Sequence, residues 1–124
     1  MPLDYLQSDN IAVQRLNASH DPAVSIIRTA FFAAEYAFFR KHIRNSNVLV
    51  AGAGLGHDSV ELAAYNHSVV GIELHPELVR RATRQCNHEQ RGNVTFVQGD
   101  MRKTTFTDQS FDAAVLNMGT IGNL

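Results

Sequence analysis

The sequence predicts an α/β fold built on an open, mostly parallel sheet of about four strands flanked by helices. Short apolar, β-branched runs alternate with segments of helical spacing, and the first run enters a turn with glycine at every second position. An acidic residue stands at or just after the end of each of the next two runs. Strands separated by helices pair in parallel through right-handed crossovers, so this order indicates an open sheet.

The predicted elements follow one another without an internal repeat. The first 20 residues are weakly patterned, and we expect a short helix with loops there. After them we predict, in order, a helix at 21–42, a strand at 47–51, a helix at 57–65, a strand at 68–73, a helix from 76 to about 90, a strand at 93–98 and a strand at 111–117. The polar residues 101–110 leave room for a turn or one helical coil, which is short for a parallel crossover.

The first predicted helix, at 21–42, has clear end signals. Asp21 can cap it, Pro22 suits its first position, and basic residues close it. Its apolar residues recur every three or four positions, but it carries more aromatic side chains than one narrow stripe holds. We expect most of them to be buried because the helix packs against the sheet on two sides. The alternative is that some of them cover a ligand pocket.

The overall composition is that of one compact domain. The chain has 124 residues, 44% of them hydrophobic, a net charge of −1 and a single cysteine, Cys86. Such a chain can bury a core, and its charge gives no basic field for nucleic acid. One cysteine forms no internal disulfide, the N-terminus lacks a secretion signal, and the apolar runs are too short to cross a membrane. We therefore expect a cytoplasmic protein with no nucleic-acid or membrane partner.

A glycine turn follows the first predicted strand. Glycine has no Cβ, so this backbone can turn sharply and approach a bound molecule, and the helix start offers free N–H groups. A dinucleotide fingerprint, G-x-G-x-x-G, would need its third glycine at position 57, which is His57. The chain instead reads G-x-G-x-G, with Gly52, Gly54 and Gly56. A tight turn that binds no ligand is the competing interpretation.

This glycine pattern resembles motif I of the class I S-adenosylmethionine (SAM) dependent methyltransferases, and two acids strengthen the resemblance. Glu73 ends the second strand, where a carboxylate can accept both hydroxyls of a ribose. Asp100 follows the third strand, where it can accept the exocyclic amine of an adenine. The resemblance implies a Rossmann-like fold that is incomplete after its fourth strand, with SAM as the cofactor. The implied cofactor-binding residues are Ala51, Gly52, Gly54, Gly56, Glu73, Leu74, Asp100, Met101 and Asn117.

Three further positions bear on the predicted site, namely Val50, His57 and Asn117. The family usually has an acid two residues before the first glycine to hold the methionine amine, but this chain has Val50, so Asp58 or a backbone carbonyl would have to substitute. We expect His57 at a pocket edge or in solvent rather than as a base. Asn117 would bind the methionine portion or the acceptor, or else merely cap its strand. No catalytic residue stands out, and the histidines lack metal-ligand spacing.

The resemblance implies transfer of the SAM methyl group to a small-molecule acceptor. Residues 46–124 would form the SAM-binding domain, and residues 1–45 a helical segment packed on it, in a single domain overall. The alternatives are a catalytically silent SAM-binding or interaction fragment and a nicotinamide-dependent oxidoreductase, the latter disfavoured by His57 and Asp100. An exposed strand at the border of the missing half predicts a homo-oligomer or pairing through that sheet edge.

Overall fold

The computed structural model describes residues 22–89 and 92–116. The chain divides into two compact units, Met1–Glu35 and Tyr36–Leu124, and each is described by itself. The short helix expected in the first 20 residues, the cap at Asp21 and the predicted site residue Asn117 lie outside the described residues. Within the described residues, no helix combines the length and the hydrophobicity that a membrane crossing requires.

Helix α2 spans Pro22–His42, as predicted. In the first unit, the rings of Phe31 and Phe32 meet edge to face, 5.9 Å apart. In the second unit, Phe39 is buried while the neighbouring Phe38 stays 58% exposed and contacts the ring of His42. The expectation that most aromatics of this helix are buried is therefore wrong for Phe31 and Phe38, which are both more than half exposed. Successive helical residues point about 100° apart, so a helix that buries Phe39 leaves Phe38 outside.

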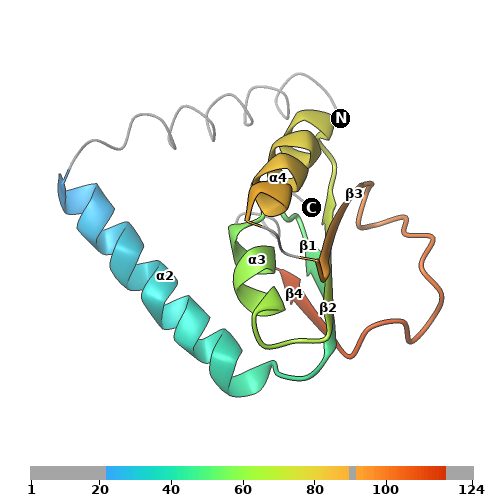
Figure 1. The fold of residues 1–124 in the computed structure, drawn as a ribbon, viewed down its shortest axis with the longest axis horizontal. Coiled ribbons are helices and arrows are strands. Elements are labelled where there is room, and N and C mark those ends of the chain that lie inside the picture. The colour runs from blue at the N-terminus through green and yellow to red at the C-terminus, as the bar shows by residue number, and fades with distance from the viewer. Residues whose placement is uncertain (1–21, 90–91, 117–124) are drawn as a thin grey trace. The chain divides into compact units, whose positions relative to one another are not determined.

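Four parallel strands form the sheet of the second unit, in the order β3-β2-β1-β4 (Figure 1). The strands are β1 (Asn47–Ala51), β2 (Ser68–Glu73), β3 (Val94–Gln98) and β4 (Ala113–Leu116). The helices between them are α3 (His57–Ala63) and α4 (Pro76–His88). The predicted succession of elements and their parallel pairing are confirmed, although α3 ends two residues early and β4 begins two residues late.

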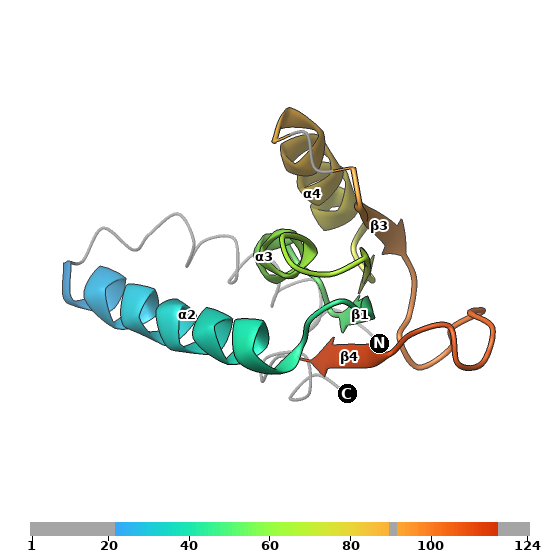
Figure 2. The same ribbon diagram turned by 60° about the horizontal axis from the view of Figure 1, so that its bottom comes forward.

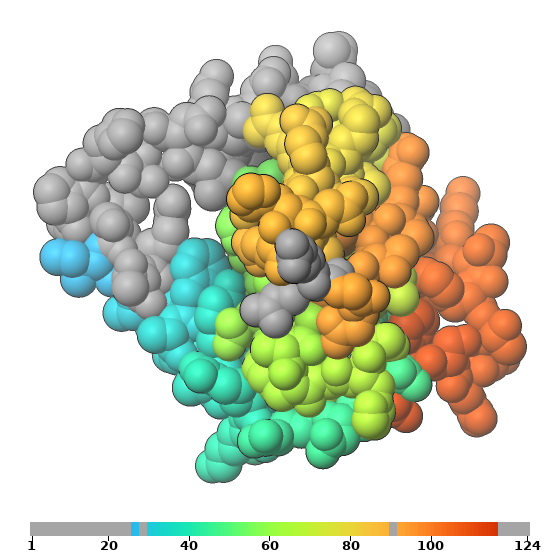
Figure 3. All heavy atoms as spheres, viewed as in Figure 1, coloured from blue at the N-terminus to red at the C-terminus, as the bar shows by residue number. Residues whose placement is uncertain are grey.

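The segment between β3 and β4 contains no helix. It leaves the sheet as a long loop on one side of the ribbon and returns to begin β4 (Figures 1 and 3). Inside it, the rings of Phe106 and Phe111 pack edge to face, 5.1 Å apart. The chain therefore returns to the sheet in parallel without a crossover helix, as the short polar connection predicted.

Helices α3 and α4 cover the same face of the sheet (Figure 2). The core lies between them and the strand residues that point toward them; its buried members are Phe39, Val48, Val50, Leu62, Ala63, Val69, Cys86, Val94 and Val115. At the end of α3, the buried side chain of Asn66 donates to Leu62 O and Ile43 O and accepts from Ser46 N. This amide fastens the end of α3 to the segment before β1.

The order of the strands determines where a ligand can bind. The chain builds β1, β2 and β3 in one direction and then places β4 on the other side of β1. In open α/β sheets, ligands bind outside the carboxyl ends of the strands, near the point where the strand order reverses. We call this side of the sheet the carboxyl edge. The glycine turn, Glu73 and the residues after β3 all lie there.

Candidate functional site

The glycine turn is shaped by three left-handed glycines. Gly52, Gly54 and Gly56 have φ angles of 69°, 58° and 87°, values that residues with a Cβ rarely adopt. The N–H groups of Gly52 and Ala53 both donate to Ile72 O, at 2.9 and 3.0 Å. The turn is therefore held to the end of β2 by hydrogen bonds within the chain itself.

The glycines of this region serve two different purposes. A Cβ on Gly54 would meet no atom within 4 Å, so the backbone there faces open space that a ligand can enter. A Cβ on Gly56 would lie 2.5 Å from Cζ of Phe96, and one on Gly71 of β2 would lie 2.7 Å from Cδ1 of the same ring. Gly56 and Gly71 thus make room for Phe96 under the turn, whereas Gly54 leaves the turn accessible.

Glu73 joins the end of β2 to the glycine turn. The residue is only 7% exposed. Its Oε1 accepts from Gly54 N, and its Oε2 accepts from His75 N, each at 3.1 Å. A carboxylate can accept about four hydrogen bonds, so each oxygen keeps capacity for a further donor. The carboxylate therefore has the acceptor capacity that the predicted ribose contact requires.

Asp100 lies two residues past the end of β3 and has a different environment. Its carboxylate accepts from Nε and Nη2 of Arg102 and from Arg102 N, with the shortest contact at 2.8 Å. These hydrogen bonds and the guanidinium charge lower the pKa of Asp100 from 3.8 to about 2. Asp100 is therefore ionised at neutral pH, the form that accepts a hydrogen bond from an amine.

The remaining predicted cofactor residues fall on the same edge. Ala51 is buried at the end of β1, and Leu74 and Met101, which follow the acids, are partly exposed. Leu74 O accepts a hydrogen bond from the Gln98 side chain, which links the ends of β2 and β3. The structure thus brings every described residue of the predicted set to the carboxyl edge, and their roles in binding stay predictions.

The missing first-strand acid is not replaced in an obvious way. Val50 is 2% exposed and belongs to the core. Asp58, the suggested substitute, is hydrogen-bonded to the Tyr36 side chain, and burial raises its pKa. It is therefore tied to α2 and less readily ionised than an exposed aspartate, so it is a poor counter-ion for an amine in this geometry. His57 is exposed, as expected.

Two residues near the site were not predicted. Arg102 was not predicted, because an arginine in a loop has many possible roles. Its position two residues after Asp100 is nevertheless compatible with the ion pair that the two residues form. Ser59, in the first turn of α3, is fully buried, and its hydroxyl has no hydrogen-bond partner within the described part of the chain. No sequence signal distinguishes Ser59 from an ordinary helix-start serine. Among the described residues, no group of three or more His, Cys, Asp and Glu side chains is arranged to hold a metal ion.

The comparisons with known proteins define the family. The model of the methyltransferase domain family matches residues 48–123, which is more than half of the chain and includes the whole carboxyl edge. The chain belongs to this methyltransferase domain family.

Particular relatives are similar over part of their length. The chain is 34% identical over 65 residues to the uncharacterised methyltransferase YcgJ and 35% identical over 69 residues to the putative methyltransferase YqeM, both of Bacillus subtilis. These alignments cover 52% and 56% of this chain but only 26% and 27% of the relatives. The crystal structure of YcgJ matches with a TM-score of 0.64 at 28% identity, covering 68% of this chain and 37% of YcgJ.

A third match shows the fold alone. The phosphoethanolamine N-methyltransferase 1 of Haemonchus contortus, solved with phosphoethanolamine and S-adenosylhomocysteine, matches with a TM-score of 0.55 at 23% identity. It covers 60% of this chain and 16% of that protein. The incomplete Rossmann-like methyltransferase fold predicted from the sequence is confirmed by these matches and by the observed strand order.

Proposed function

We propose that this domain binds SAM at the carboxyl edge and serves in methyl transfer to a small-molecule acceptor. The observation that carries the proposal is the junction of Glu73 and Gly54. A buried carboxylate with spare acceptor capacity is fixed beside a glycine whose missing Cβ leaves open space. Membership of the methyltransferase family supports SAM over other adenosine-containing cofactors.

Each part of the edge has a distinct binding role in this proposal. The ribose hydroxyls donate to Glu73, because that carboxylate is already oriented by two backbone N–H groups. The amine of the adenine donates to Asp100, while Leu74 and Met101 contribute apolar contact beside the ring. The methionine portion lies against Gly52 and Gly54, where the absence of Cβ atoms permits close approach.

The protein's contribution to the chemistry is placement. SAM supplies a methyl group already activated on a sulfonium. Fixing the ribose at Glu73 and the adenine at Asp100 sets the direction of the remaining portion of the cofactor, and alignment of reacting groups is worth several kcal/mol. A general base is not needed for an acceptor that is already nucleophilic, which agrees with the lack of a candidate base among the predicted residues.

A SAM-binding module without turnover is the second candidate. It is favoured by one observation, namely that none of the described residues at the carboxyl edge is identified as a catalytic group. Pairing with another chain through the free side of β4 is a further proposal, because within the described residues β1 is the one strand that pairs with β4. A nicotinamide-dependent oxidoreductase is less well supported, because the family match is to methyltransferases.

Calorimetric titration of the chain with SAM, S-adenosylhomocysteine and NAD tests the proposal. We expect saturable 1:1 binding of both sulfur compounds and at least tenfold weaker binding of NAD. Glu73→Gln is expected to reduce binding of S-adenosylhomocysteine. The new side chain would have one oxygen to accept hydrogen bonds, and that oxygen cannot serve the two backbone N–H donors and both ribose hydroxyls.

Two results would contradict parts of the proposal. Failure of both sulfur compounds to bind a folded chain would end it. Binding without methylation of any compound in a pool of small metabolites would favour the module without turnover.

A further inference from the structure

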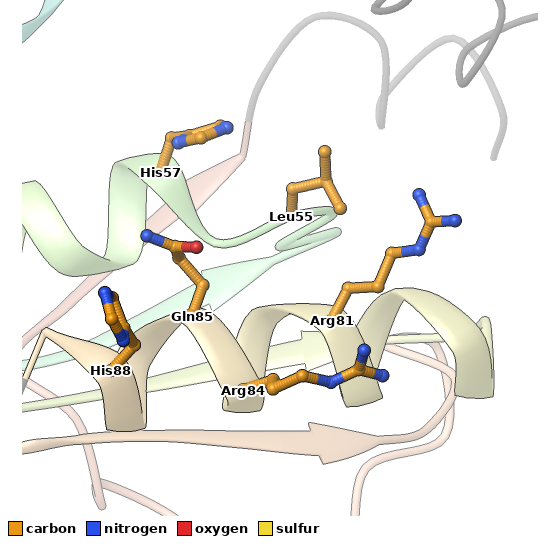
Figure 4. A pocket seen from close by; sticks show the side chains of 6 residues that line it. All are labelled: Leu55, His57, Arg81, Arg84, Gln85 and His88. Atoms are coloured by element: carbon orange, nitrogen blue, oxygen red, sulfur yellow. The ribbon is translucent and has the colours of Figure 1, made fainter.

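A hollow beside the glycine turn has no role in the function proposed above. It lies between the start of α3 and the exposed face of α4 and has a volume of about 620 Å³, within the range of small-molecule pockets. Its lining residues are Leu55, His57, Arg81, Arg84, Gln85 and His88 (Figure 4). None of these is among the predicted cofactor-binding residues, although Leu55 lies between Gly54 and Gly56 in the glycine turn.

The lining is basic on both walls. Arg81, Arg84 and His88 recur at spacings of three and four, which places them on one face of α4, and His57 stands across from them on α3 (Figure 4). Both guanidinium groups extend toward the N-terminal end of α4 (Figure 4). No carboxylate is among the described residues that line the hollow.

The nearby acids leave part of this charge unpaired. Glu77 pairs with Arg80 at 2.6 Å and with Arg81 at 3.5 Å. Glu89, at the other end of the helix, accepts from the Gln85 side chain. Arg84 has no carboxylate partner within the described part of the chain. A hollow with an unpaired guanidinium, a second one that is only partly neutralised and two imidazoles attracts anions.

The chemistry of the ligand follows from these charges and their spread. Guanidinium groups bind phosphate oxygens through paired hydrogen bonds. The eight residues from Arg81 to His88 span about 10 Å of helix, which suits a ligand with more than one anionic group. The chain carries a net charge of only −1, whereas proteins that bind nucleic acid through its backbone usually carry an excess of positive charge. We propose that the hollow binds a small molecule with two or more phosphate groups.

Calorimetric titration of the full chain with inorganic pyrophosphate, at physiological ionic strength, tests this site. We expect sub-millimolar binding of one equivalent, with inorganic phosphate binding more weakly. Arg84→Ala should weaken the affinity about tenfold or more, as expected for losing charge-assisted hydrogen bonds. His57→Gln should also weaken it, because the ligand contacts both walls.

Arg80→Ala is the matched control. It removes the same charge from the same helix, but Arg80 is exposed, paired with Glu77 and absent from the lining. We expect its affinity for pyrophosphate to stay within about twofold of the wild type. Circular dichroism and thermal unfolding establish that each variant is folded, which its surface position predicts.

Several outcomes would overturn the proposal. These are no binding of pyrophosphate by the wild type, an equal loss in Arg80→Ala and Arg84→Ala, and displacement of pyrophosphate by S-adenosylhomocysteine. An Arg84-dependent affinity for a single-stranded RNA oligonucleotide, without affinity for pyrophosphate, would assign the surface to nucleic acid instead. Because none of the lining residues is among the predicted cofactor-binding residues, failure here would leave the proposed function standing.

Discussion

Glu73 and Asp100 end neighbouring strands and were predicted by the same argument, yet the structure gives them opposite surroundings. Glu73 is buried, and backbone N–H groups of the glycine turn and of the segment before α4 hold its carboxylate. Asp100 is held by the side chain and backbone of a residue two positions away in an exposed loop. Glu73 is therefore hydrogen-bonded to a distant part of the fold, whereas Asp100 is held only within its own loop. Substitutions at Glu73 and in the glycine turn beside it should therefore cost stability as well as binding, whereas substitutions at Asp100 should affect mainly binding.

Gly56→Ala should give the largest loss of stability, because it disturbs the packing of Phe96 under the glycine turn. The new Cβ would lie 2.5 Å from the ring of Phe96, and the residue has a left-handed φ of 87°. We expect a loss of about 3 kcal/mol in the free energy of unfolding, from backbone strain and overpacking together, measured by urea denaturation.

Gly54→Ala is the matched control for that experiment. It shares the left-handed backbone but meets no atom within 4 Å, so only the strain of about 1–2 kcal/mol remains. It should nevertheless reduce binding of S-adenosylhomocysteine, since its methyl group occupies the open side of the turn. Equal stability losses in the two variants would refute the separate roles of the two glycines.

Glu73→Gln and Asp100→Asn compare the two acids directly. In Glu73→Gln, the new side-chain amide would leave one backbone donor without an acceptor, at a cost of about 1–3 kcal/mol in unfolding free energy. Asp100→Asn should lower the unfolding midpoint far less than Glu73→Gln, because Asp100 lies in an exposed loop, while weakening the affinity for S-adenosylhomocysteine about tenfold. Denaturant unfolding and calorimetry on the same samples measure both quantities. A destabilised Asp100→Asn chain with intact binding would reverse the assignment.

The smallest effect concerns the pKa of Asp100. Hydrogen bonds from Arg102 lower that pKa to about 2, so their stabilising contribution is complete above the ordinary value of 3.8 and is lost as the pH falls toward 2. Arg102→Gln should move the midpoint upward, toward 3.8, as measured by the carboxyl carbon shift in NMR. Glu77, whose pKa is lowered by Arg80, serves as an internal control that should not move. An unchanged Asp100 midpoint would show that Arg102 does not hold the carboxylate in solution.

Local signals predicted the elements and the edge at which the candidate site residues gather. Hydrophobic period and glycine spacing located the strands, the turn and both acids, because these features depend on residues close together in sequence. The burial of Phe31 and Phe38 on α2 was predicted incorrectly, since a count of aromatics does not reveal which of them are buried. The same limit applies to the hydrogen-bond partner of Asp58, because the side chain of Tyr36 belongs to an earlier helix and is brought close only by packing.

The sequence by itself determined that the strands form a parallel α/β sheet and that Gly54, Glu73 and Asp100 lie at its carboxyl edge. Only the tertiary structure decided which glycine makes room for Phe96, which acid is buried, and that His57 faces the basic side of α4. The physical reason is that strand and turn formation follow local backbone preferences. Burial, charge pairing and hollows arise from contacts between segments that are far apart along the chain.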